Sequence, residues 1–119
     1  MERHSQRVAY GETIVELGAE NPNVVSLEAD LGKSTMSTLF QQAYPERYFE
    51  MGIAEADMIS TAAGLAASGK IAFCSTFAVF AAGRAYDQIR QTVAIGKLNV
   101  KICGSSSGLS DFGDGSTHQ

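Results

Sequence analysis

The sequence has little of what proteins that bind nucleic acid or membranes need. Its 9 lysines and arginines are scattered over 119 residues and the formal net charge is -4, so no basic patch for nucleic acid is expected. No apolar run approaches the roughly 20 residues of a membrane span. Residues 1–6 also lack the apolar stretch of a secretory signal. We therefore expect neither nucleic acid nor a membrane as a partner.

Cysteine and proline are also scarce, with 2 of each. Cys74 and Cys103 lie inside apolar runs that are typical of strands, which indicates reduced core thiols and a cytoplasmic protein. With 45% hydrophobic residues, the chain is long enough for one compact core and too short for two. We therefore expect a single domain over residues 1–119.

The spacing of the apolar residues predicts helices that alternate with short strands. We expect helices at residues 8–19, 39–43, 54–68 and 78–95, and strands at residues 24–29, 47–51, 71–76 and 100–103. This alternation, with connections of a few residues, is typical of a parallel sheet with helices on both faces. The predicted fold class is therefore α/β.

Ligands of such sheets bind beyond the carboxyl ends of the strands, so the loops at those ends are the expected site. These loops cover residues 30–35, 51–55, 75–80 and 104–119. Lys33, Ser34 and Thr35 are expected in the first of them, without secondary structure. Composition alone favours a flexible tail for the last loop, but its Asp114 and His118 are side chains that can bind hydroxyl groups.

The rest of the sequence is organised around residues 49–58, where an apolar run opens a helix of small residues. Glu55 and Asp57 are the only charges in residues 51–68. The simplest interpretation of Glu55 is compensation of the helix dipole. A charge that borders so apolar an element also needs a partner, however. We therefore expect Glu55 to carry the chemistry.

Four segments resemble the pyrimidine-binding domain of the transketolase family, specifically the second subunit of transketolases encoded as two chains. They are residues 6–12, 49–55, 75–80 with 84–88, and 113–119. The segments follow the same order along nearly the whole chain, which makes the resemblance specific. It implies the thiamine diphosphate-binding fold, with a pyrimidine-type domain and thiamine diphosphate as the cofactor.

The resemblance also implies roles around the cofactor ring. In the family, the glutamate at the position of Glu55 forms a hydrogen bond with a ring nitrogen of the aminopyrimidine. Phe77 and Phe80 match the aromatic wall around that ring, although aromatic residues at a strand-to-helix turn are more often ordinary core. A third aromatic residue of the family is Gly83 here. The expected wall is therefore less complete.

Further matches concern the sugar substrates. Asp114 and His118 match positions that bind sugar hydroxyls, and Arg7 and Ser34 match positions that hold the phosphate of the sugar. A solvated surface charge and a helix cap are the plain alternatives for Arg7 and Ser34. Residues 105–107 are serines where the family commonly has a histidine. This difference leaves open a phosphorylated sugar held differently, another sugar or a sulfonated one.

The diphosphate end of the cofactor is expected on another chain. Residues 113–115 superficially match the start of the diphosphate and metal motif of thiamine enzymes, but its asparagine lies further on and only 4 residues follow. We expect no metal ligand here, so a partner, an N-terminal diphosphate-binding transketolase subunit, would hold the diphosphate and Mg²⁺ in a homo- or hetero-oligomer. The family's domain continues with another helix and strand, so this chain is expected to be incomplete at its C-terminus.

The predicted activity is transfer of a two-carbon ketol unit from a ketose to an aldose, with the chain inactive on its own. Three alternatives remain open at this point. A deoxyxylulose-phosphate synthase and the beta subunit of a 2-oxo-acid dehydrogenase share the glutamate, although the ending at Asp114 and His118 favours transketolase over the dehydrogenase. A fragment or interaction module without catalysis is the third.

Overall fold

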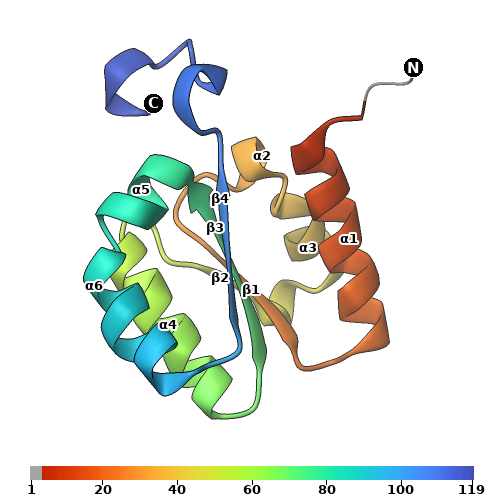
Figure 1. Ribbon diagram of the computed structural model, residues 1–119. Coiled ribbons are helices and arrows are strands. Elements are labelled where there is room, and N and C mark those ends of the chain that lie inside the picture. Colours follow the sequence, from red (N-terminus) through yellow and green to blue (C-terminus); the bar gives the residue numbers. More distant parts are fainter. Residues whose placement is uncertain (1–3) are drawn as a thin grey trace.

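The computed structural model describes residues 4–119. Residues 1–3, which belong to the stretch 1–6 discussed above in connection with a secretory signal, lie outside the described residues. A four-stranded parallel sheet forms the centre, with the strand order β2-β1-β3-β4 (Figure 1). The strands are β1 (Val24–Glu28), β2 (Tyr48–Glu50), β3 (Ile71–Phe77) and β4 (Val100–Ser105). The predicted parallel sheet is confirmed, with strand ends that differ by one or two residues.

Helices cover both faces of the sheet, as predicted (Figure 1). They are α1 (Gln6–Glu20), α2 (Gly32–Thr35), α3 (Thr38–Ala43), α4 (Glu55–Ala67), α5 (Ala78–Gly83) and α6 (Tyr86–Gln88). Short helical turns complete the chain: η1 (Pro45–Arg47), η2 (Ile89–Ala94), η3 (Gly108–Ser110) and η4 (Gly115–Thr117). Among residues 4–119, no helix has both the length and the apolar character that crossing a membrane requires.

The core consists of two apolar clusters, one on each face of the sheet. Leu27 and Met58 are fully buried in the cluster between the sheet and α4, and Ile14 and Phe40 in the cluster beneath α1 and α3. All five residues of β1 are buried, because helices cover this strand from both sides. The strand therefore fixes the positions of the loops that follow it and its neighbours.

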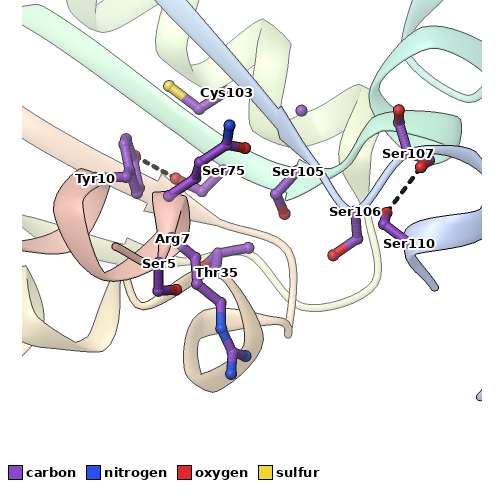
Figure 2. A pocket seen from close by; sticks show the side chains of 12 residues that line it. Ser5, Arg7, Tyr10, Thr35, Ser75, Cys103, Ser105, Ser106, Ser107 and Ser110 are labelled. Carbon is purple, nitrogen blue, oxygen red and sulfur yellow. Dashed lines mark hydrogen bonds between the residues drawn. The ribbon is translucent and has the colours of Figure 1, made fainter. Parts of the chain in front are cut away.

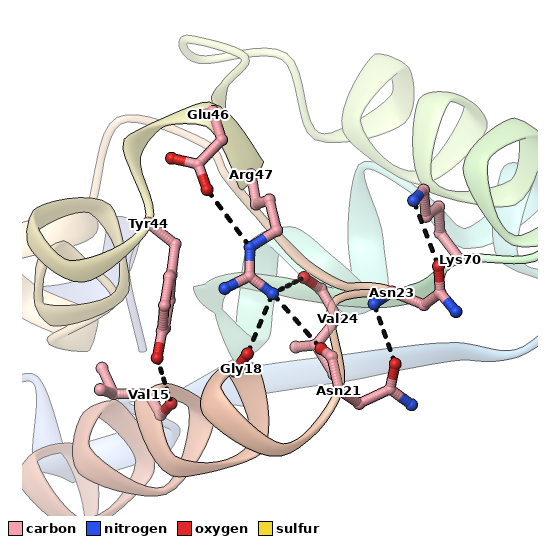
Figure 3. Close-up of polar contacts among 9 residues, drawn as sticks. All are labelled: Val15, Gly18, Asn21, Asn23, Val24, Tyr44, Glu46, Arg47 and Lys70. Carbon is pink, nitrogen blue, oxygen red and sulfur yellow. Dashed lines mark hydrogen bonds and ion pairs between the residues drawn. The ribbon is translucent and has the colours of Figure 1, made fainter.

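Arg47 links the end of α1 to the start of β1 (Figure 3). Its Nη1 donates to the carbonyl oxygens of Gly18 at 3.0 Å and Asn21 at 3.3 Å. These are carbonyls at a helix end, which lack partners within the helix. The guanidinium carbon also lies 3.9 Å from the ring centroid of Tyr44, a cation–π contact. The Arg47 side chain therefore holds the C-terminal end of α1 close to Tyr44, at the C-terminal end of α3.

The prediction of one helix over residues 78–95 is wrong. The segment divides into α5, α6 and the π-helical turn η2, with a break at Ala85, whose φ of -102° and ψ of 11° are not helical. The apolar spacing predicts a core face made by Ala78, Ala82, Ala85, Ile89 and Val93. Ala85 and Val93 are buried, Ala78 and Ile89 are partly buried, and Ala82 is exposed, so this prediction is only partly confirmed.

The prediction that residues 33–35 lie in a loop is also wrong. They form the end of α2, where the backbone amides of Ser34 and Thr35 donate to the carbonyl of Leu31 at 2.8 and 2.9 Å. The Thr35 hydroxyl donates to the buried carboxyl of Glu28 at 2.7 Å, which holds the turn against the sheet. This tertiary contact stabilises a helix too short to form on propensity alone.

Candidate functional site

A cavity of about 190 Å³ lies at the carboxyl ends of the strands. Its lining comes from the loops after β1 and β2, from the start of α4, from α5 and its end, and from the tail. The residues are Ala29, Asp30, Leu31, Ile53, Glu55, Phe80, Arg84 and His118. The fold therefore brings together Glu55, Phe80 and His118, three of the residues that the sequence singled out. The name "Glu55 cavity" is used for this space below.

Glu55 is the first residue of α4 and is only 4% exposed. Its side chain makes no hydrogen bond or ion pair with any other residue in the described range 4–119. Asp57, in the same helical turn, is exposed. The helix dipole favours a carboxylate at either place and does not explain the burial of one of them. Glu55 lines the cavity and has no partner for its carboxyl group within residues 4–119, so a ligand in the cavity could supply that partner.

Two phenylalanines and a histidine form an aromatic cluster beside Glu55. The rings of Phe77, at the end of β3, and Phe80, in α5, are 6.2 Å apart between centroids and inclined by 12°. The His118 ring meets both edge-on, with centroids 5.1 Å from Phe80 and 6.0 Å from Phe77. Phe77 does not line the cavity itself and lies against Phe80. The combination of a flat wall and an unpaired carboxyl group fits a flat ring whose nitrogen binds the carboxyl group.

Arg7 lines a second, larger cavity of about 570 Å³ (Figure 2). Hydroxyl groups dominate its lining, which is Ser5, Gln6, Arg7, Tyr10, Thr35, Ser75, Cys103, Gly104, Ser105, Ser106, Ser107 and Ser110. Arg7 contacts the backbone of Ser34 and not its hydroxyl group: Arg7 Nη1 donates to the Ser34 carbonyl oxygen at 3.2 Å. The side chain of Ser34 does not line this cavity.

The tail places its two candidate residues differently. His118 lines the Glu55 cavity, and its Nδ1 is 2.7 Å from the hydroxyl of Thr117. Asp114 is exposed at the start of η4 and lines neither cavity. Its carbonyl accepts a hydrogen bond from the Thr117 hydroxyl at 3.3 Å, which shapes the turn. Of this pair, only His118 lies beside Glu55.

Glu28 is a buried acid that the sequence reasoning did not select. Its carboxyl group accepts hydrogen bonds from Ser37 Oγ at 2.5 Å, Thr35 Oγ1 at 2.7 Å and the backbone amide of Ala29 at 3.2 Å. Burial raises the pKa of Glu28 above its ordinary value, and this outweighs the hydrogen bonds, which favour the ionised form. Because Ala29 lines one cavity and Thr35 the other, Glu28 fixes the wall between them.

The raised pKa of Glu28 predicts a stability that depends on pH. The folded chain keeps a proton that the unfolded chain releases above its ordinary pKa, so this residue reduces stability progressively as the pH rises from about 4.5. Glu28→Gln cannot ionise, so the free energy of unfolding of the variant minus that of the wild type should increase as the pH rises above about 4.5. Urea unfolding of both proteins measures it, and a difference independent of pH would contradict the prediction.

Comparisons with known proteins agree with the geometry. The profile of the family described as transketolase, pyrimidine-binding domain, matches residues 3–119. A transketolase C-terminal section from Methanocaldococcus jannaschii is 50% identical over 113 residues, which are 95% of this chain and 36% of that protein. A 6-deoxy-6-sulfo-D-fructose transketolase subunit from Clostridium sp. strain MSTE9 is 41% identical over 118 residues, 99% of this chain and 37% of that protein.

A solved structure is also similar. It is described as a split gene transketolase in the form of an inactive beta4 tetramer, with a TM-score of 0.75 and 58% identity. The match covers 82% of this chain and 33% of that one. The chain therefore spans about a third of the length of these three proteins.

Proposed function

The chain belongs to the transketolase pyrimidine-binding domain family, and from this membership we propose that it contributes the Glu55 half of a thiamine diphosphate-dependent transketolase. The observation that carries the proposal is the buried Glu55 carboxyl group, without a partner among residues 4–119, beside Phe80 and His118. We propose residues 1–119 as one pyrimidine-binding domain. The activity is transfer of a two-carbon ketol unit between a ketose and an aldose.

Thiamine diphosphate, when bound, would supply the nucleophilic carbon that carries the ketol unit. Glu55 would hold a proton at a ring nitrogen of the pyrimidine, since its carboxyl group is the acid that lines the cavity from a buried helix start. Phe80, supported by Phe77, would contact the face of that ring and exclude water. His118, which lines the same cavity, would bind hydroxyl groups of the sugar near the reacting carbons.

The larger cavity suits the far end of the sugar. Arg7 would bind an anionic terminal group there, with the Ser34 carbonyl holding the guanidinium in place. The serines at residues 105–107 add neutral hydroxyls where a cation is common in the family. A phosphate or a sulfonate fits this set, and one relative is named for a sulfonated sugar. The exposed Asp114 would bind hydroxyls of a sugar that extends past the Glu55 cavity.

We propose that the diphosphate and Mg²⁺ are held by a second chain, an N-terminal diphosphate-binding subunit. The names of two relatives, a C-terminal section and a split gene transketolase, support a division of the enzyme between chains. The solved split gene protein is described as an inactive beta4 tetramer, which supports inactivity of this kind of subunit alone. Cys74 and Cys103 are free thiols, in keeping with the proposed cytoplasmic location.

Thermal unfolding tests the division of the site. Thiamine diphosphate with Mg²⁺ should leave the Tm of this chain unchanged, because the anchoring half is absent. With the diphosphate-binding chain added, ligand at 100 times its Kd should stabilise the complex by about 2.7 kcal/mol. Inorganic diphosphate with Mg²⁺ is the control, since it lacks the ring that Glu55 would bind. A large shift for this chain alone would contradict the shared site, and no shift in the complex would contradict the cofactor.

A further inference from the structure

Glu50 joins the two loops that border the Glu55 cavity. It is the last residue of β2 and lies opposite Glu28 of β1 in the sheet register. A single oxygen, Glu50 Oε1, accepts the backbone amide of Asp30 at 2.8 Å and that of Gly52 at 3.0 Å. Asp30 follows β1 and Gly52 follows β2, so one carboxylate connects its own loop to a loop 20 residues earlier in the sequence.

Both donors have left-handed backbone conformations. The φ angles are 60° at Asp30 and 70° at Gly52. A residue with a side chain, such as Asp30, seldom adopts this conformation. Where such a residue does adopt it, the surrounding structure holds the backbone in place. The two hydrogen bonds to the side-chain oxygen of Glu50 are such a restraint, because one acceptor holds both backbone amides.

The two loops and the start of α4 supply most of the residues that line the Glu55 cavity. Asp30 and its neighbours line the cavity from the first loop, and Ile53 and Glu55 line it from the second. The carbonyl of Gly52 also accepts a hydrogen bond, at 2.8 Å, from the backbone amide of Ala54, the residue that precedes Glu55. The backbone amide of Met51 also donates to the carbonyl of Glu28 at 2.9 Å, and the bridge at Glu50 adds the side-chain tie between the two loops.

We infer that Glu50 is a positioning residue for the Glu55 carboxyl group, a role that rests on the proposed function of Glu55. Glu50 does not line the Glu55 cavity, so it acts through the backbone of the two loops. Its carboxylate fixes the backbone of the first loop relative to that of the second. Loss of the bridge separates the walls without removing any residue that lines the cavity.

Amide hydrogen exchange of the chain tests the bridge without reference to activity. In Glu50→Ala, the amides of Asp30 and Gly52 should exchange at least roughly tenfold faster than in the wild type. Glu50→Gln keeps an acceptor oxygen at the same place and should restore most of the protection. Glu16→Ala, which removes an exposed glutamate of α1 that lines neither cavity, should change neither amide. Unchanged exchange of both amides in Glu50→Ala would overturn the inference.

The complex with the diphosphate-binding chain tests the consequence for the site. Glu50→Ala should raise the KM for thiamine diphosphate about tenfold while kcat falls less, because the ring must bind between displaced walls. Glu50→Gln should recover most of the affinity. An unchanged KM in Glu50→Ala overturns the positioning role alone. Full turnover in Glu55→Gln overturns the proposed function, and the exchange rates then still decide whether the bridge exists.

Discussion

Glutamine in place of Glu55 should reduce the kcat of the reconstituted enzyme by roughly 10²–10⁴ while the chain stays folded. Glutamine keeps the size of the side chain and removes the acid that would hold a proton at the ring nitrogen. The Glu55 side chain has no hydrogen bond or ion pair within residues 4–119, so a glutamine of the same size breaks no polar contact in the described chain. Steady-state ketol transfer, measured with the diphosphate-binding chain present, gives kcat, and urea unfolding gives the stability.

Asp57 provides a matched control for Glu55 because both acids lie in the first turn of α4. Asp57 is exposed and lines neither cavity, so Asp57→Asn should leave kcat within about twofold. If Glu55 serves only the helix dipole, both substitutions should cost a similar 0.3–1 kcal/mol of stability, roughly, and neither should lower kcat. Retained turnover in Glu55→Gln would therefore return Glu55 to that electrostatic role.

The position of the site could be predicted from the sequence because the signals involved are local. The strands are short apolar runs, and Val24–Glu28 is buried along its whole length, as a strand covered on both faces must be. Glu55 stands out because it is a charge at the start of an apolar helix. Once the strands are known to be parallel, their carboxyl ends share one edge of the sheet, which brings the loops with Glu55 and Phe80 together.

The hydrogen-bonding partners of Glu28 and Glu50 could not be predicted in the same way. Glu28 meets Ser37, 9 residues on, only because α2 turns back towards the sheet. Glu50 meets the amide of Asp30, 20 residues earlier, only because β1 and β2 are neighbours in register. A charged residue that closes an apolar strand is the signal that both share. It indicates a group at the site edge without identifying what the group binds.

The tail shows a second limit of sequence reasoning. Asp114 and His118 are both polar and belong to the same short segment, yet only His118 lines the Glu55 cavity. The difference comes from the turn η4, which turns the chain so that the His118 ring packs against Phe77 and Phe80. Side-chain chemistry predicted the kind of residue, whereas contacts between distant segments decide which one reaches the site.

The packing of α1 against the segment after α2 leaves no room for a methyl group at Gly11. A Cβ placed there would lie 2.6 Å from the Met36 carbonyl oxygen and 2.9 Å from Leu39 Cδ1. Met36 itself has a left-handed backbone, with a φ of 67°, so its carbonyl has little freedom to move away. We expect Gly11→Ala to destabilise the fold by about 1–3 kcal/mol, although alanine favours helices.

Gly64 is the matched control, because it lies inside α4 and nothing stands within 4 Å of a Cβ built on it. Gly64→Ala should stabilise the chain by about 1 kcal/mol, which is the helix preference of alanine over glycine alone. The same substitution in two helices should therefore change the free energy of unfolding in opposite directions, as urea denaturation of both variants would show. If Gly11→Ala stabilised the chain as much as Gly64→Ala does, α1 would not approach Met36 as closely as the structure shows.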